Sequence, residues 1–212
     1  MKTFLFRNYK MLSLSLALTV ALTLALAAPA AAQDLSSFYV TPKIMASYQK
    51  ADMNGGHERN AVFGLGASVG SDLSYSSSLP IRLEAEYLYH GNETFSKGGD
   101  SLDLSAHSIM GNAFFDLQTD TDLTPYIGGG LGMACLNDRI NVDNSSSKGN
   151  RWNFAWNAGG GVAWGLSEKI ALDLGYRYVD LGKTHDHSTA SGSHNASLTA
   201  HEFSLGFRFT GF

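Results

Sequence analysis

Nine charged residues are the strongest candidates for chemistry in this sequence, because they recur at alternate positions. They are Lys43, Arg82, Glu84, Glu86, Asp116, Asp173, Arg177, Glu202 and Arg208. In a β-strand this spacing places the charges on one face, together with Gly, Ser and Ala. Such charges must pair or stay hydrated, because an isolated buried charge is costly. We therefore expect a network of ion pairs, and the alternative is a narrow path whose ion preference these charges set.

A second candidate site is the histidine-rich segment near the C-terminus. His185, His187 and His194 lie there with Asp186, among Ser, Gly and Thr residues. Imidazole and carboxylate groups at this spacing are ligands for Zn²⁺ or Cu²⁺. A segment of this composition is poorly preorganised for a metal, so the sequence favours a hydrated polar loop over a metal site.

Serines beside these histidines allow an enzyme to be considered, such as one that acts on lipid A. Ser188 or Ser197 with His187 or His194 would supply a nucleophile and a base. No acid is convincingly placed to orient that base, and no His-x-Ser-Asn run occurs. The glycine-rich segment 128–132 lacks the Lys and Ser/Thr of a phosphate-binding loop. The sequence therefore predicts no enzyme and no cofactor.

The secondary structure that positions these residues can be predicted from the alternation of apolar and polar residues, which has a period of two. Apolar or aromatic residues alternate with small or polar ones most clearly in 81–89, 154–164, 170–178 and 203–209, and more weakly in 38–50, 61–71, 106–117 and 125–136. Strict alternation is typical of strands, and about 9–11 residues let a tilted strand cross a bilayer. The sequence predicts an all-β fold: a single closed antiparallel transmembrane β-barrel of about eight strands.

The segments between these stretches suggest two kinds of connection. Those near 51–60, 91–101, 137–151 and 182–198 are polar and long on average, whereas those near 72–79, 118–124 and 166–168 are shorter. Long loops at one end and tight turns at the other are typical of outer-membrane barrels. We expect four polar surface loops, with both ends of the barrel chain on the periplasmic side.

The composition of the two faces favours lipid on the outside of the barrel. The apolar positions are large and aromatic, whereas the opposite face is rich in glycine, as in Gly128, Gly130, Gly159 and Gly206. A narrow lumen needs small residues, and a lipid-embedded barrel carries its apolar face outward. Several aromatic residues near strand ends are candidates for the interfacial girdles. These are Tyr87, Tyr89, Trp152, Trp164, Tyr176 and Tyr178.

The N-terminal segment differs from the rest of the chain. Lys2, Arg7 and Lys10 precede an uncharged apolar run, which ends at a small-residue Ala-x-Ala site. This order predicts a signal peptide at 1–32 and a barrel domain at 33–212. Without the three leader cations, 12 positive and 19 negative side chains remain, a net charge of −7. An acidic domain argues against nucleic acid as a partner, and the single cysteine, Cys135, excludes an intrachain disulfide.

Four stretches, 82–89, 125–132, 175–182 and 203–209, resemble the opacity-type and OmpA-like family of small outer-membrane β-barrels. The resemblance implies eight strands in the outer membrane of a Gram-negative bacterium, contact with lipid and lipopolysaccharide, and surface loops that act as antigens or adhesins. It also implies that the barrel-insertion machinery reads a terminal aromatic residue, here Phe212. The usual signal has apolar residues an even number of positions before the terminal aromatic residue. Here the distance to Phe212 is odd for Phe209, Phe207 and Leu205, so the spacing departs from the usual one unless a bulge at Gly211 places Phe212 on the same face as these residues.

These observations together favour a structural and surface-antigen or adhesin-like protein with a largely filled barrel. A small porin for ions or small solutes is the alternative, and a lipid A-modifying enzyme is third. The loops would determine any host or surface ligand, and loop sequences carry little pattern from which to name one. The oligomeric state is not determined by the sequence.

Overall fold

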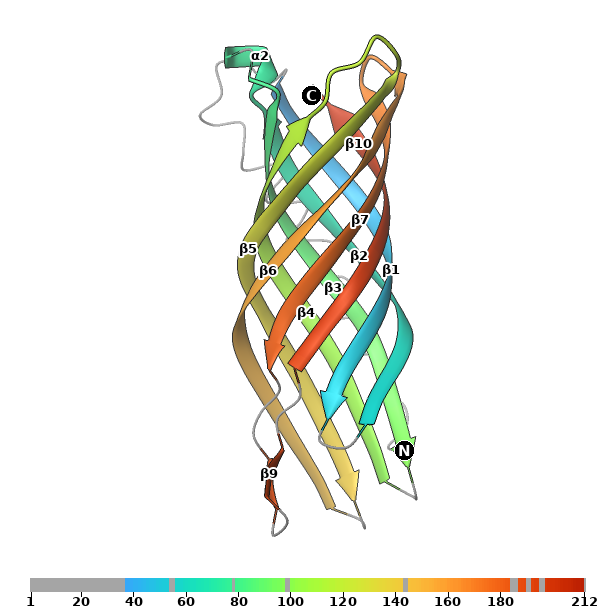
Figure 1. Cartoon of the computed structure of the whole chain (residues 1–212), viewed down its shortest axis with the longest axis vertical. Coiled ribbons are helices and arrows are strands. Elements are labelled where there is room, and N and C mark those ends of the chain that lie inside the picture. The colour runs from blue at the N-terminus through green and yellow to red at the C-terminus, as the bar shows by residue number, and fades with distance from the viewer. Residues whose placement is uncertain are drawn as a thin grey trace, which may run out of the picture.

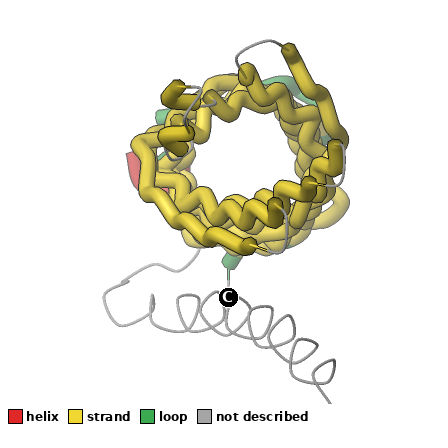
Figure 2. Tube along the Cα trace, turned by 90° about the horizontal axis from the view of Figure 1, so that it is seen from below, coloured by secondary structure: helices red, strands yellow, loops and turns green. Residues whose placement is uncertain are grey.

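Eight antiparallel strands close into a ring, as the computed structural model shows from the side and along the axis (Figures 1 and 2). The strands are β1 (Phe38–Met53), β2 (Gly56–Asp72), β3 (Ile81–Lys97), β4 (Asp100–Asp116), β5 (Leu123–Val142), β6 (Ser145–Ser167), β7 (Ile170–Lys183) and β10 (Ser197–Thr210). The structure describes residues 37–53, 56–77, 79–97, 100–142, 145–183, 187–189, 192–194 and 197–211. None of the helices described is long and apolar enough to cross a membrane.

Closure comes from β1, which pairs with β2 on one side and with β10 on the other. Lys43 is the register partner of both Gly66 and Gly206. A closed ring leaves no unpaired strand edge in the hydrocarbon layer, where no water can bond to the backbone. The predicted fold, a closed antiparallel barrel of eight strands, is confirmed.

Alternation sorts the side chains to the two faces as the sequence predicts. On β3, Arg82, Glu84 and Glu86 point inward and are buried, whereas Leu83 and Ala85 are exposed on the outside. Phe63, Ile127 and Leu131, which are 78%, 61% and 63% exposed, belong to an apolar outer band. A lipid-embedded barrel needs this inverted arrangement, with apolar side chains outside and polar side chains within.

Three of the four segments expected to be long loops are paired strands instead. Register pairs continue to Met53 and Gly56 between β1 and β2, to Lys97 and Asp100 between β3 and β4, and to Val142 and Ser145 between β5 and β6. Outside the membrane both faces of a hairpin meet water, so the hydrophobic alternation disappears although backbone pairing continues. The prediction of long loops was therefore wrong for these three segments, which are extended polar hairpins.

The fourth segment, between β7 and β10, holds a separate small hairpin of β8 (His187–Thr189) and β9 (Gly192–His194). It lies at the same end of the barrel as the three extended hairpins (Figure 1). This end is called the hairpin end below.

The opposite end of the barrel, called the turn end, carries short connections. Between β2 and β3 a single helical turn, α2 (Ser74–Ser77), begins where the Asp72 carboxylate accepts a hydrogen bond from the Ser74 amide at 2.9 Å. Such a bond satisfies a free amide at a helix start. β1 begins and β10 ends at this same end, since Tyr39 and Thr210 are register partners. This register agrees with the prediction that the barrel strands begin and end beside the short turns.

Candidate functional site

The lumen of the barrel contains all nine charged residues that the sequence singles out. Arg82 and Glu202 are each 1% exposed, and Glu84 and Glu86 are also buried. The other five are intermediate in exposure: Lys43, Asp116, Asp173, Arg177 and Arg208. Charges at such depth require partners of opposite sign, and the structure supplies one for each.

Seven of these residues form one continuous chain of ion pairs that starts near the turn end. Asp116 Oδ2 lies 2.6 Å from Arg82 Nε, and Arg82 Nη1 lies 3.4 Å from Glu84 Oε1. Glu84 Oε2 is then 3.6 Å from Lys43 Nζ. The residues come from β1, β3 and β4, so this part of the chain links strands that are not all neighbours in the ring.

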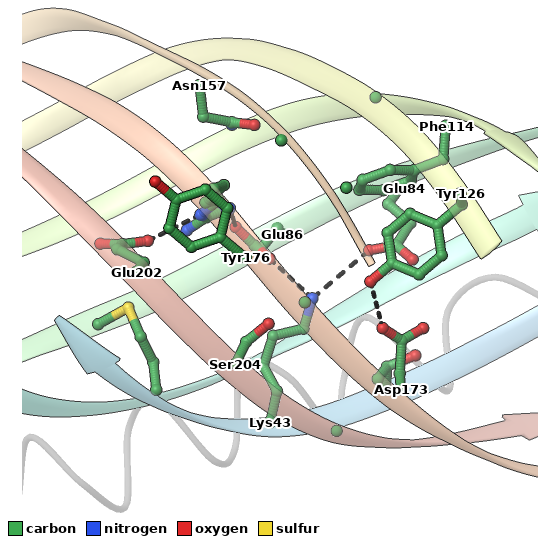
Figure 3. A pocket seen from close by; sticks show the side chains of 18 of the residues that line it. Lys43, Glu84, Glu86, Phe114, Tyr126, Asn157, Asp173, Tyr176, Glu202 and Ser204 are labelled. Atoms are coloured by element: carbon green, nitrogen blue, oxygen red, sulfur yellow. Dashed lines mark hydrogen bonds and ion pairs between the residues drawn. The ribbon is translucent and has the colours of Figure 1, made fainter. Parts of the chain in front are cut away.

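The chain continues toward the hairpin end through Glu86, which bridges two cations. Its carboxylate oxygens lie 2.7 Å from Lys43 Nζ and 2.6 Å from Arg177 Nη1. Arg177 Nε in turn lies 2.7 Å from Glu202 Oε2. Figure 3 shows Lys43 reaching from β1 between Glu84 and Glu86 across the lumen. The ion pairs therefore cross the lumen and occupy its centre.

A second group lies at the turn end of the lumen. Arg208 forms an ion pair with Asp173. The other carboxylate oxygen of Asp173 accepts a hydrogen bond from the Tyr126 hydroxyl (Figure 3). Tyr126 also stacks under Arg82, whose Cζ lies 4.9 Å from the centre of its ring. A desolvated guanidinium over an aromatic face is stabilised by about 2 kcal/mol. The aromatic rings thus hold the arginines in place beside their carboxylates.

Sequence reasoning missed several polar lumen residues that take part in these groups. They are Tyr39, His90 and Tyr126, which contact Glu84, Glu202 and Asp173 respectively. His90 is 1% exposed, with Nδ1 3.2 Å from Glu202 Oε1 and Nε2 3.1 Å from Ser108 Oγ. The sequence pattern could have identified His90, because this residue continues the inward alternation of Arg82, Glu84 and Glu86.

Beyond His90, toward the hairpin end, most described lumen side chains are apolar, although Gln49 is also buried there. A buried cluster fills this part of the lumen, with no member more than 3% exposed. Its members are Ala106, Met110, Ala134, Leu136, Ala155, Val179, Leu181, Leu198 and Ala200. A cavity of about 50 Å³ lies among the ion pairs, which is room for a few water molecules. Among the described residues, the lumen is thus closed by ion pairs in one half and by apolar packing in the other.

Glycines opposite large side chains make this filling possible. Arg177 is the register partner of Gly159, Phe114 of Gly128, and Asp173 of Gly206. A Cβ on Gly159 would overlap the backbone of Arg177 and the Tyr176 carbonyl oxygen. The alternating glycines that the sequence placed in the lumen therefore leave room for the ion-paired side chains of neighbouring strands.

The other candidate residues are only partly described. His187 and His194 are register partners on β8 and β9, whereas His185 lies outside the described residues. No group of three metal-ligating side chains occurs within the described ranges. Ser197, considered as a nucleophile, pairs through its backbone with Asp52 and Lys183. Phe212 also lies outside the described residues, which end at Gly211 with a φ of 65°.

Comparison with known proteins agrees with this architecture. The family described as "outer membrane protein beta-barrel domain" matches residues 18–210. The chain belongs to this family. It is thus an outer-membrane β-barrel, and its apolar outer band is the surface that faces lipid.

One sequence relative and two solved structures of similar fold come from three kinds of bacteria. Outer membrane protein PagN of Salmonella typhimurium is 28% identical over an alignment that covers 73% of this chain and 78% of that protein. Neisserial surface protein A is 21% identical, with a TM-score of 0.59 over 82% of this chain and 96% of that one. Ail, the attachment invasion locus protein of Yersinia pestis, is 13% identical, with a TM-score of 0.54 over 82% of this chain and 99% of that one.

Proposed function

We propose that this protein is a sealed outer-membrane barrel that presents polar hairpins at the cell surface, in a structural and surface-antigen or adhesin-like role. The observation that carries the proposal is the contrast between the filled lumen and the extended hairpins. Ion pairs and apolar side chains fill the lumen, whereas three hairpins continue as paired strands toward the hairpin end. A filled lumen offers no wide path for solutes, so the surfaces that remain for recognition are the hairpins.

The named relatives support a role at the cell surface. Ail is named for attachment and invasion, and it has also been crystallised with the heparin analogue sucrose octasulfate. For this chain we propose a host or surface ligand that contacts the hairpins. Domain 33–212 carries 12 positive and 19 negative side chains, a net charge of −7, which does not favour a polyanion such as heparin, so a different class of ligand is more consistent with the charge.

We also propose how the protein is exported, inserted and oriented in the outer membrane. Segment 1–32 is removed on export, and domain 33–212 is inserted by the barrel-insertion machinery, with Phe212 as its signal. Both ends of the barrel chain then face the periplasm, and the hairpin end faces outward. In the membrane the protein contacts lipid and lipopolysaccharide, and it acts by binding and without catalysis.

The test is an attachment assay with bacteria that express the protein at equal surface levels. Leu136 and Arg151 are register partners, so residues 137–150 can be replaced by a two-residue Asn-Gly turn without disturbing the strands below. We expect this variant to fold, as a heat-dependent gel shift would show, and to lose attachment to an epithelial cell monolayer. The corresponding shortened β3–β4 variant tests the second hairpin.

The matched control is Glu86→Gln, which changes the lumen and leaves every hairpin intact. It should attach as well as the parent protein when equal amounts are at the surface. If folded variants with either hairpin shortened attach as well as the parent, or if the parent attaches no better than cells without it, the proposed function is wrong.

A further inference from the structure

Two outward-facing histidines on the barrel have the same surroundings. His107 on β4 lies opposite Tyr89 of β3, and its Nδ1 is 2.8 Å from the hydroxyl of Tyr87. The ring centres of Tyr87 and Tyr89 lie 6.1 Å and 4.9 Å from that of His107. A Tyr-x-Tyr segment on one strand thus holds an imidazole of the next strand by one hydrogen bond and two ring contacts.

The same arrangement recurs at His201 on β10. Its register partner is Tyr178 of β7, and its Nδ1 lies 2.8 Å from the hydroxyl of Tyr176. The two ring centres lie 6.1 Å and 5.5 Å from that of His201. In the ring, β3–β4 and β7–β10 are separated by two strands in either direction, so the two Tyr–His pairs lie on opposite sides of the barrel.

Both imidazoles lie at the hairpin-end boundary of the apolar outer band. The next outward residues toward the turn end are Ile109 and Phe203, which are 55% and 59% exposed. The next outward residues toward the hairpin end are Ser105 and Thr199, which are polar. Each histidine is therefore the last ring before the surface becomes polar, at the level where lipid headgroups begin.

The hydrogen bond to tyrosine determines what the imidazole offers to that layer. When the tyrosine hydroxyl donates to Nδ1, the neutral ring carries its proton on Nε2, which is then free to donate. Lipid headgroups at this level carry phosphate oxygens, which are strong acceptors for such donors. The outward register partners on the other side, Cys135 for His107 and Tyr48 for His201, bring no carboxylate.

Among the side chains that the structure describes near the two histidines, one carboxylate distinguishes the two places. Asp180 lies two residues beyond Tyr178 on β7, toward the hairpin end, and it accepts a hydrogen bond from the Gly182 amide at 2.8 Å. Its negative charge near the His201 pair would disfavour an anion there. The pair at His107 should therefore bind a phosphate group more tightly than the pair at His201.

We propose that the Tyr87–His107 and Tyr176–His201 pairs are binding sites for the phosphate group of a membrane lipid, with the imidazole Nε2 as the donor. The acyl chains of that lipid would lie along the apolar band below each histidine. This position favours a lipid over a free phosphate ion, because only a lipid has acyl chains that can contact the apolar band.

The test uses the folded protein in bilayers of digalactosyldiacylglycerol, which has no phosphate, with a small fraction of phosphatidic acid. Native mass spectrometry then counts the phosphatidic acid molecules retained by each barrel. We expect up to two in the parent protein and weaker retention in His107→Phe and in His201→Phe. In the double variant the affinity should fall about tenfold or more at each site, since each loses a hydrogen bond to a charged group.

Trp152→Phe is the matched control, because it removes an outward N–H donor at the same end of the band and leaves both histidines in place. It should retain phosphatidic acid like the parent. Equal retention by the folded double variant and the parent would overturn the proposal.

A second measurement does not depend on a histidine variant. In protein with ¹⁵N-labelled histidine, phosphatidic acid should shift the Nε2 signals of His107 and His201 saturably. Tyr87→Phe and Tyr176→Phe, which keep the rings, should bring in the second tautomer and weaken that response. If inorganic phosphate in a bilayer without phosphatidic acid shifts these signals with the same affinity, or if neither ligand shifts them, the lipid site is wrong.

Discussion

Glu86 Oε1 lies 2.6 Å from Arg177 Nη1 in the centre of the barrel, although the two residues are 91 positions apart in the chain. The other oxygen of the same carboxylate lies 2.7 Å from Lys43 Nζ. One carboxylate thus holds two cations from β1 and β7, which makes Glu86 the centre of the ion-pair chain that closes the lumen.

Replacing Glu86 with Gln should destabilise the barrel strongly. The amide keeps the size of the side chain but leaves Lys43 and Arg177 without the charge between them. Breaking a buried ion pair by removing one partner costs about 3–5 kcal/mol. Denaturant titration of the protein folded into vesicles measures this difference in the free energy of unfolding.

The control for this loss is the Lys43→Met/Glu86→Gln double variant, in which one charge of each sign is absent. It should recover part of the stability, and the cycle should give a coupling energy of about 0.5–3 kcal/mol. Strictly additive effects of the two changes would mean that the pair does not interact in the folded barrel.

Leu174 on β7 tests which face of the barrel meets lipid. It is 47% exposed on the outside, between Val162 of β6 and Leu205 of β10. Leu174→Arg should cost about 2–4 kcal/mol, the range for a cation on the lipid face near the bilayer centre. Ile170→Arg, at the turn end of the same strand, should cost at most about 1 kcal/mol, because the charge reaches the interface. Equal stabilities of Leu174→Arg and the parent would contradict the face assignment.

Gly159 tests the close packing of the lumen. A Cβ there would overlap the backbone of Arg177 and the Tyr176 carbonyl oxygen, so Gly159→Val should displace the guanidinium from Glu86. Overpacking of this kind typically costs about 1–3 kcal/mol. At Gly165 a Cβ would lie 3.6 Å from the nearest heavy atom, so Gly165→Ala is a control with little expected effect. Similar unfolding curves for both variants would show that the lumen is looser than the structure indicates.

The predicted leader can be tested directly by mass spectrometry of the protein extracted from outer membranes. A signal peptide with the Ala30–Ala32 cleavage site predicts a mature chain that begins at Gln33. A chain that retains residues 1–32 in the outer membrane would contradict this prediction.

The sequence predicts the membrane-embedded part of the fold well, because lipid on one side and the lumen on the other impose an alternation that the residues must follow. The extended hairpins could not be predicted in this way. Asp52 and His57, or Lys97 and Asp100, pair through their backbones in segments whose sequence shows no hydrophobic alternation. Polarity indicates exposure to water, and it does not distinguish a loop from a hairpin.

The lumen was predictable as a set of residues and not as a set of contacts. Alternation identifies Glu86 and Arg177 as inward-facing, and it would also have identified His90. Which carboxylate meets which cation depends on the stagger of strands around the ring. Lys43 pairs with Glu86 of β3 because the registers of β2 with β1 and with β3 bring the two residues to similar heights, and no local pattern encodes those registers.

The central claim is that side chains seal the barrel, and single-channel recording of the folded protein in a planar bilayer tests it most directly. A heat-dependent gel shift must first show that the chain has folded. We predict a silent bilayer for the parent protein, because the ion pairs through Glu86 and the apolar cluster beyond His90 occupy the lumen. Steady openings whose ion preference changes when Arg82 or Glu84 is neutralised would contradict the sealed barrel and show that the protein is a small porin.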